Sequence, residues 1–196
     1  KKMSLMMWSL TPQRLKSTCR LPWQRHPLVN TKPRPGRLCS TDARRSNVYV
    51  AIGTNLGDRA LNVLTALRAL KKDVGEIKKT SFLYETSPQY VEDQPLFLNA
   101  ACHIETTLDP QELLHRLKDI EENMGRVETV RNGPRVIDLD ILFFEDQIIN
   151  CVTSKGLPLT VPHPAIAERE FVLRPLCDLA PRLAHPAPPP AAAAAA

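Results

Sequence analysis

The sequence predicts an α+β fold with an antiparallel sheet packed against helices, on three observations. An apolar run at 48–53 (VYVAIG) is typical of a buried strand, and a turn and a helical pattern follow it. Two β-rich segments, at 77–85 and 97–105, precede a second helical pattern. An alternating segment at 136–144 comes next. The order βαββαβ is the ferredoxin-like arrangement, which places the helices on one face of the sheet.

The helices are predicted from their caps and from apolar spacing. Residues 58–72 begin with an aspartate N-cap candidate and carry leucines at every third position. The second helix begins at Asp109, which is followed by proline in the first turn, and it ends at Gly125. A last helix is predicted at 168–179, where Pro175 should kink or split it.

The segments between these elements are predicted from their turn residues. Residues 86–95 contain two prolines and read as a long loop, and residues 126–135 form an irregular loop rich in arginine. A short edge strand is expected at 148–149, and 159–164 is an extended segment that ends in His-Pro.

Charge separates a leader at 1–46 from a domain at 47–186. A tail at 187–196 is set apart by its Pro/Ala composition. Residues 1–46 hold eleven Lys/Arg and one acid, a net charge of +10. Residues 47–196 hold fifteen Lys/Arg and twenty acids, a net charge of −5. An acidic domain is a poor candidate for nucleic-acid binding. The chain has no apolar run of membrane-spanning length, so no membrane partner is expected.

The leader has the composition of an organellar transit peptide. It is rich in arginine, serine and threonine, almost free of acids, and lacks the apolar core of a secretory signal. A basic tail with no targeting role is the alternative. We therefore expect a mitochondrial (matrix) location, with the plastid as the alternative.

Two aspartates in the last predicted strand are candidate metal ligands. Alternate side chains of a strand share a face, so Asp138 and Asp140 point the same way, about 7 Å apart, while Ile137, Leu139 and Ile141 point into the core. Carboxylates so placed suit Mg²⁺, which takes one or two of them together with phosphate oxygens. A solvated acidic face is the alternative.

Arginines beside this strand point to phosphoryl transfer. Arg126, Arg131 and Arg135 precede Asp138, and carboxylates for a metal beside guanidinium groups for phosphate are the usual combination in such sites. Surface ion pairing is the alternative for any single pair. The chain has no Walker-type phosphate loop. His163 lies between prolines that fix its position, which suits either a phosphate donor or a structural role.

Seven ordered segments support a family resemblance. They are AIGTNLG at 51–57, YETSP at 84–88, DQPLFLNA at 93–100, Ile120-Glu121 with Gly125-Arg126, GPRVIDLDI at 133–141, LTVPHP at 159–164 and REFVLRPL at 169–176. In this order and spacing they resemble the 6-hydroxymethyl-7,8-dihydropterin pyrophosphokinases across nearly all of 47–186.

The resemblance implies a kinase of folate biosynthesis, 2-amino-4-hydroxy-6-hydroxymethyldihydropteridine diphosphokinase. Such an enzyme transfers pyrophosphate from ATP to 6-hydroxymethyl-7,8-dihydropterin and releases AMP. It also implies two Mg²⁺ ions held by Asp138 and Asp140, with Arg126 and Arg135 assisting the transfer. Residues at the family's ATP-binding positions are Lys118, Glu121, Ile141, Thr160, His163 and Arg169. Residues at its pterin-binding positions are Thr86, Phe97, Asn99 and Phe171.

The chain departs from bacterial members at three positions. Asn132 replaces a frequent tryptophan, and Glu128 and Pro158 replace frequent basic residues that contact the nucleotide. Eukaryotic members are often fused to dihydropteroate synthase, so the resemblance also implies a longer natural polypeptide. The alternatives to this enzyme are a ferredoxin-like module that only binds a small ligand, and a metal-dependent nucleotidyl transferase.

Overall fold

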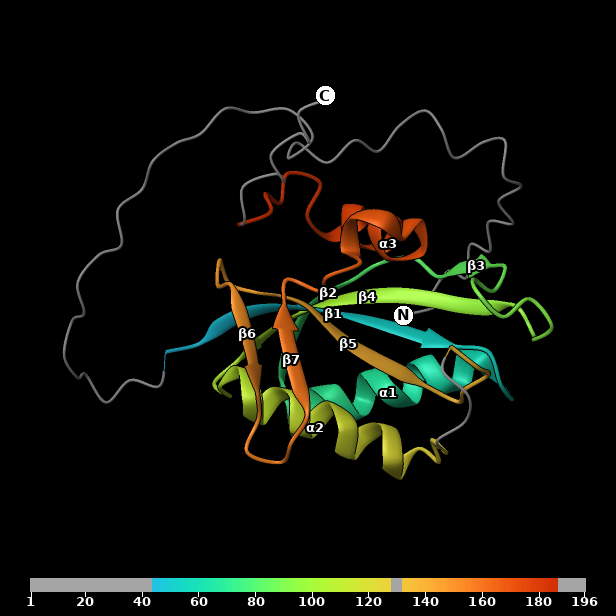
Figure 1. The fold of residues 1–196 in the computed structure, drawn as a ribbon, viewed down its shortest axis with the longest axis horizontal. Coiled ribbons are helices and arrows are strands. Elements are labelled where there is room, and N and C mark those ends of the chain that lie inside the picture. The colour runs from blue at the N-terminus through green and yellow to red at the C-terminus, as the bar shows by residue number, and fades with distance from the viewer. Residues whose placement is uncertain (1–43, 128–131, 187–196) are drawn as a thin grey trace, which may run out of the picture.

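The computed structural model describes residues 44–127 and 132–186 (Figure 1). Arg131 and Glu128 lie outside the described residues, as does nearly all of the predicted leader. The elements in chain order are β1 (Ser46–Thr54), α1 (Arg59–Asp73), β2 (Gly75–Thr80), β3 (Tyr84–Thr86), β4 (Phe97–Thr106), α2 (Pro110–Asn123), β5 (Asp138–Phe144), β6 (Ile149–Val152), β7 (Pro158–Val161), the short 3₁₀ helix η2 (Ile166–Glu168) and α3 (Glu170–Leu179).

The main sheet has the predicted βαββαβ order. Its strands lie in the order β2-β4-β1-β5, all pairs are antiparallel, and β3 adds a short fifth strand beside β4. The segment 77–85 therefore contributes to two strands and not one. The strand expected at 148–149 is β6, which pairs with β7 in a separate two-stranded sheet. The α+β class and the βαββαβ order of elements along the chain are confirmed.

Helices cover both faces of the sheet, whereas the sequence predicted them on one (Figure 1). Val48, Val50 and Ile52 of β1 belong to the core under α1 and α2. Tyr49 and Ala51, on the opposite face of the same strand, pack against a smaller core that includes Leu176 of α3. The uninterrupted apolar run of β1 is typical of a strand buried on both faces, and α3 covers the second of them.

The two large helices begin at their predicted caps. Asp58 accepts a hydrogen bond from the backbone N–H of Leu61, and Asp109 forms a capping box at the start of α2. The leucine stripe predicted for α1 is only partly correct, because Leu61 is 52% exposed. Leucines at every third position drift around the helix by about 60° a step. The buried face is formed by Val63, Ala66 and Leu70.

The last helix differs from its prediction at both its start and its middle. It begins at Glu170, because residues 166–168 form the separate turn η2, and it continues through the buried Pro175 without splitting. No helix in the two described segments combines the length and the apolar character needed to cross a membrane.

Candidate active site

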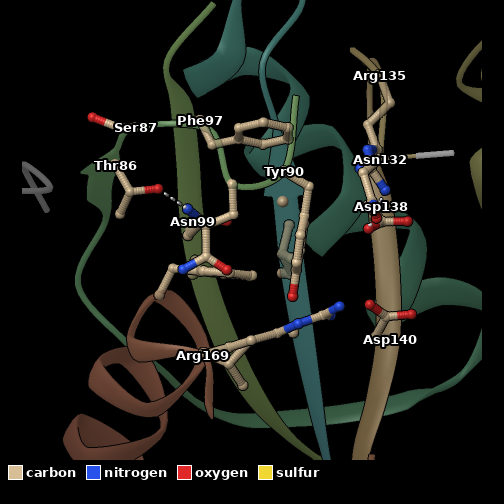
Figure 2. A pocket seen from close by; sticks show the side chains of 17 residues that line it. Thr86, Ser87, Tyr90, Phe97, Asn99, Asn132, Arg135, Asp138, Asp140 and Arg169 are labelled. Atoms are coloured by element: carbon tan, nitrogen blue, oxygen red, sulfur yellow. Dashed lines mark hydrogen bonds and ion pairs between the residues drawn. The ribbon is translucent and has the colours of Figure 1, made fainter. Parts of the chain in front are cut away.

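The main pocket lies on the α3 side of the sheet, where β1, β4 and β5 run side by side (Figure 2). Its floor is one row of residues across three strands, because Gly53 of β1 is the register partner of both Asn99 in β4 and Asp138 in β5. A side chain at the central position would fill this floor. A Cβ added to Gly53 would lie 3.3 Å from the Asn99 Oδ1 atom.

The two aspartates of β5 face this pocket together, as alternation predicts, but their surroundings differ. Asp138 is held by two guanidinium groups: Arg126 Nη1 lies 2.6 Å from Oδ1, and Arg135 Nη1 lies 2.8 Å from Oδ2. Asp140 has no hydrogen bond or ion pair within the described part of the chain. Burial and the neighbouring charge of Asp138 raise the pKa of Asp140, and the positive charges of His163 and Arg169 only partly oppose this.

A third carboxylate, Glu121 of α2, lies beneath this pair and outside the pocket. It is 1% exposed, and its Oε1 atom accepts a hydrogen bond of 2.6 Å from the Leu139 backbone N–H, between the two aspartates. Lys118 Nζ lies 2.9 Å and Arg126 Nη1 2.7 Å from Glu121 Oε2. Burial raises the pKa of Glu121, against the opposing charge of Lys118. Glu121 therefore joins α2 to the strand that carries the aspartates.

Arg126 connects the buried carboxylate to the pocket. Its Nη1 atom contacts both Glu121 and Asp138. Burial lowers the pKa of Arg126, but the carboxylates of Asp138 and Glu121 outweigh this and raise it overall. The predicted residues Lys118, Glu121 and Arg126 thus form an ion network behind β5 and do not line the pocket.

The opposite end of the pocket is polar and aromatic. Asn99 is 6% exposed, and its Nδ2 donates a 2.8 Å hydrogen bond to the Thr86 hydroxyl. Phe97 and Phe171 also line the cavity, and the Arg135 guanidinium lies 5.7 Å from the centre of the Phe97 ring. All four residues predicted for the pterin therefore line this pocket, and Figure 2 labels Thr86, Phe97 and Asn99 among them.

Three residues predicted for the nucleotide lie along β5 and β7, outside the pocket lining. Thr160 is exposed on β7. The backbone N–H of His163 donates to the Leu142 carbonyl at 3.1 Å, which holds this residue beside β5. Burial lowers the pKa of His163, and Asp140 partly opposes the effect. Ile141 is 5% exposed and packs in the core, so its side chain faces away from the cavity.

Sequence reasoning missed two residues that shape this site. Asn55 is buried and clamps two loops: its Nδ2 donates to Gln94 Oε1 and to the Pro95 carbonyl, and its Oδ1 accepts from the Arg135 backbone N–H at 2.8 Å. The sequence signal that could have indicated this role is an asparagine directly after a predicted strand. The second residue, Tyr90, stands in the pocket from the loop before β4, and nothing in its local sequence distinguishes it.

Comparison with known proteins identifies the family. A family model described as 7,8-dihydro-6-hydroxymethylpterin-pyrophosphokinase (HPPK) matches residues 49–181. The chain belongs to the HPPK family. An HPPK relative from Aquifex aeolicus, named 2-amino-4-hydroxy-6-hydroxymethyldihydropteridine pyrophosphokinase, is 39% identical over 141 residues, which are 72% of this chain and 84% of the relative.

Longer relatives contain the HPPK region as one part. "Folic acid synthesis protein FOL1" of Dictyostelium discoideum is 48% identical over 75% of this chain and 22% of its own length. "Folate synthesis bifunctional protein, mitochondrial" of Pisum sativum is 45% identical over 74% of this chain and 27% of its own length. The chain therefore spans only about a quarter of these two relatives.

A solved structure supports the HPPK fold. The chain "Plasmodium falciparum HPPK-DHPS A437G with STZ-DHP" superposes with a TM-score of 0.63 at 21% identity, covering 74% of this chain and 44% of that one. At this level of identity the likeness concerns the fold alone.

Proposed function

We propose that the domain transfers the β,γ-pyrophosphoryl group of ATP to the hydroxymethyl oxygen of 6-hydroxymethyl-7,8-dihydropterin and releases AMP. Membership of the HPPK family supports the choice of reaction. One observation carries it to this pocket: a buried amide, Asn99, lies in the same cross-strand row as Asp138, and Asp140, which has no hydrogen bond or ion pair among the described residues, lies beside it. A heterocycle and a chain of phosphates could therefore lie end to end in one cavity.

The amide end would hold the pterin. Asn99 offers donors and an acceptor to the edge of a heterocycle, and its bond to Thr86 fixes the orientation of the amide. Phe97 and Phe171 supply aromatic faces on which a planar bicyclic ring can stack. These four residues would place the hydroxymethyl group toward the aspartates.

The acidic end would hold the phosphates. Here the hydroxymethyl oxygen bonds to the β-phosphorus, the bond from that phosphorus to the departing oxygen of AMP breaks, and the hydroxyl proton is lost. Arg135 and Arg169 line the cavity at this end, with Arg126 directly behind Asp138. Their guanidinium groups would stabilise the negative charge that develops during the transfer.

The carboxylates of this end fit magnesium. Asp140 is half-buried with no hydrogen bond or ion pair in the described chain, desolvation and its neighbour Asp138 raise its pKa, and a cation would offset both effects. Carboxylate oxygens are hard ligands of the kind Mg²⁺ selects. We propose that Asp138 and Asp140 would hold two Mg²⁺ ions, which would supply positive charge to neutralise the phosphates.

A cation bound there would share the Asp138 carboxylate with two arginines. Oδ1 accepts from Arg126 and Oδ2 from Arg135, and each oxygen keeps a lone pair that a metal ion could use. No group of three His, Cys, Asp or Glu side chains suited to a metal occurs among the described residues, so phosphate oxygens and water would complete the coordination.

The remainder of ATP would extend from the pocket along β5 toward β7. Thr160 and His163 lie on this path, and Ile141 could take part through its main chain. Lys118 and Glu121 would act from behind the strand, by fixing Arg126 and the main chain between the aspartates.

We also propose a mitochondrial matrix location and a longer natural polypeptide. The basic, acid-poor composition of residues 1–46 supports targeting, with the plastid as the alternative. The Pisum sativum and Arabidopsis thaliana relatives carry "bifunctional" and "mitochondrial" in their names, and the Plasmodium falciparum structures join HPPK to DHPS. A fusion to dihydropteroate synthase would therefore place two folate-pathway activities on one chain.

The function is tested by following AMP release from the full chain with ATP, Mg²⁺ and 6-hydroxymethyl-7,8-dihydropterin. We expect AMP and the pterin diphosphate in equal amounts, only when all three are present. Release of pyrophosphate in place of AMP would indicate a nucleotidyl transferase. Pterin binding without any turnover would indicate a binding domain, and either result would overturn the proposal.

A further inference from the structure

Tyr90 has no part in the proposed function, yet it lines the pocket. Its φ angle is 73°, in the left-handed region that bulky residues rarely adopt. The Val91 backbone N–H donates to the Gln89 carbonyl at 2.9 Å across it, so Tyr90 is the central residue of a three-residue turn of a rare and strained type. The residue is 66% exposed, so core packing does not explain why a large side chain occupies this turn.

The surrounding contacts hold the turn in place. Gln94 Nε2 donates to the Val91 carbonyl at 2.8 Å and to the Asn132 carbonyl at 3.0 Å, while Gln94 Oε1 accepts from the buried Asn55. The backbone at Tyr90 is thus fixed to the two loops that border the pocket. Strain held in this way at a ligand cavity is typical of a functional position.

Arg169 is the side chain that Tyr90 faces. The guanidinium carbon of Arg169 lies 6.0 Å from the centre of the Tyr90 ring and 5.7 Å from the centre of the Phe171 ring. The Arg169 guanidinium has no hydrogen bond or ion pair within residues 44–127 and 132–186, and its Nε atom is buried without a partner. The contacts that hold this cation are therefore two aromatic faces, which attract it through their π electrons.

The held guanidinium is directed toward the acidic end of the pocket. Figure 2 shows the Arg169 side chain extending across the cavity past the Tyr90 ring toward Asp140. A free arginine side chain would sample many rotamers. The entropy lost when an anion fixes one rotamer would weaken the binding. Two aromatic faces that fix the side chain in advance would reduce that loss.

We propose that Tyr90 and Phe171 form an aromatic clamp on Arg169, and that Tyr90 is a positioning residue that presents this guanidinium to the phosphates of the nucleotide. The inference rests on the proposed function for the identity of the anion. The clamp itself rests on the geometry of Tyr90, Phe171 and Arg169.

The first test observes the clamp without any ligand. In the full chain, the Nε–H signal of Arg169 in a ¹H–¹⁵N NMR spectrum is assigned by its loss in Arg169→Lys. We expect an upfield ring-current shift that persists in Tyr90→Phe and diminishes in Tyr90→Leu, which keeps a side chain but removes the π face. An unchanged Arg169 signal in Tyr90→Leu would overturn the clamp.

The second test measures the affinity for α,β-methylene-ATP with Mg²⁺ by calorimetry. We expect Tyr90→Leu to weaken binding roughly fivefold, the range of a single cation–π contact, and Tyr90→Phe to restore it to within about twofold. Pterin affinity should fall less than nucleotide affinity in both variants, because the clamp acts on the side chain that faces the phosphates. In an Arg169→Ala background, Tyr90→Leu should cause no further loss, and additive losses would overturn the positioning role.

A third variant separates the ring from the backbone strain. Tyr90→Gly removes the penalty for a positive φ, so its melting temperature should stay level or rise while nucleotide affinity falls as in Tyr90→Leu. A parallel fall in stability and affinity would show a structural role only and would overturn the inference. If the wild-type chain bound no nucleotide, the proposed function would fail, and the Arg169 NMR signal would still decide whether the clamp exists.

Discussion

Asp138 and Asp140 are two residues apart on one strand and face one cavity, yet their electrostatic roles are opposite. Asp138 forms ion pairs with two arginines, whereas Asp140 is half-buried and has no hydrogen bond or ion pair in the described chain. An unpaired charge that is partly withdrawn from water opposes folding, and removing one partner of such an ion pair leaves the other charge uncompensated. The same chemical substitution should therefore have opposite effects at the two positions.

Asp140→Asn should stabilise the metal-free protein by about 1 kcal/mol, while the matched variant Asp138→Asn should destabilise it by a similar amount. Both variants should lose nearly all AMP release, because each lacks a proposed metal ligand. Urea unfolding without divalent ions measures the first effect. Equal destabilisation by both variants would contradict the different electrostatic roles that the described residues give to Asp138 and Asp140.

Arg135→Ala should lower turnover by about 10²-fold or more, because it removes charge stabilisation where the phosphates would react. Asp140→Ala should have a comparable effect, and both variants should stay folded. The control is Arg116→Ala, which removes an exposed arginine on α2 that pairs weakly with Asp119. Near-normal AMP release by Arg135→Ala and Asp140→Ala would refute the site assignment.

Gly53→Ala should weaken pterin binding more than nucleotide binding. The added methyl group would lie 3.3 Å from Asn99 Oδ1, a tight contact that displaces the amide from its bond with Thr86. We expect the dissociation constant for the pterin to rise about tenfold, equivalent to about 1.4 kcal/mol. Calorimetry with each ligand separately tests this, and equal losses for both ligands would contradict it.

At the residue scale, the sequence predicted what depends on local geometry. Strand alternation correctly placed Asp138 and Asp140 on one face, opposite Ile137 and Leu139. The ion network around Glu121 could not be predicted from the sequence, because its partners come from a helix, a loop and a strand that only the tertiary fold brings together. The position of Tyr90 depends on a strained turn that no local pattern favours.

At the scale of elements, one hydrogen bond attaches α3 to the short strand β3. The Tyr84 hydroxyl donates to Asp178 Oδ2 at 2.7 Å, and the same oxygen accepts from the Phe82 backbone N–H. Tyr84 is buried, and α3 follows directly after Arg169 in the chain. This contact therefore supports the wall of the pocket from the opposite end of the helix.

Tyr84→Phe should destabilise the protein by about 1.5–3 kcal/mol, the range for a hydrogen bond to a charged group. The loss should also depend on pH. Burial and the bond to Asp178 raise the pKa of Tyr84 from 10.0 to about 12. The protonated hydroxyl is thus favoured in the folded state, so its contribution is complete below pH 10 and is lost as the pH rises toward 12.

Urea unfolding of the wild-type chain and of Tyr84→Phe across this range gives the measurement. The difference between their free energies of unfolding should be constant from pH 7 to pH 9 and should shrink between pH 10 and pH 12. A difference that does not change over this range would show that Tyr84 is not coupled to Asp178.

Helix boundaries were predictable where a cap defines them and less so elsewhere. Asp58 and Asp109 fix the starts of α1 and α2 through side-chain bonds that sequence alone indicates. The start of α3 has no side-chain cap, and a preceding 3₁₀ turn displaced the prediction by two residues. Pro175 lies inside α3 with its side chain buried, and the helix continues through it.

At the scale of the whole molecule, the sheet separates two cores of unequal size. The larger lies under α1 and α2, and the smaller lies under α3 next to the pocket. The order of helices and strands along the chain could be predicted from the amino-acid sequence, but the second core could not. A wholly apolar run such as 48–53 reveals that a strand is buried and does not reveal which element covers each face.

The two cores can be compared with matched variants. Leu117→Ala and Leu176→Ala each remove a fully buried leucine, and each should cost about 2–5 kcal/mol. Only Leu176→Ala should also weaken pterin binding, measured well below the melting temperature, because α3 carries Phe171. Equal binding by both variants would show that the pocket does not depend on the smaller core.

The row formed by Asn99, Gly53 and Asp138 limits how the ligand preference of this pocket can change. Strands in a sheet lie about 4.8 Å apart, so the two outer positions of the row are about 10 Å apart. Main-chain bonds fix this interval, and neither a rotamer change nor a longer loop can adjust it. A change in ligand preference would therefore require new side chains at these positions. The distance between them would stay the same, because the sheet sets the length of ligand that can reach both ends.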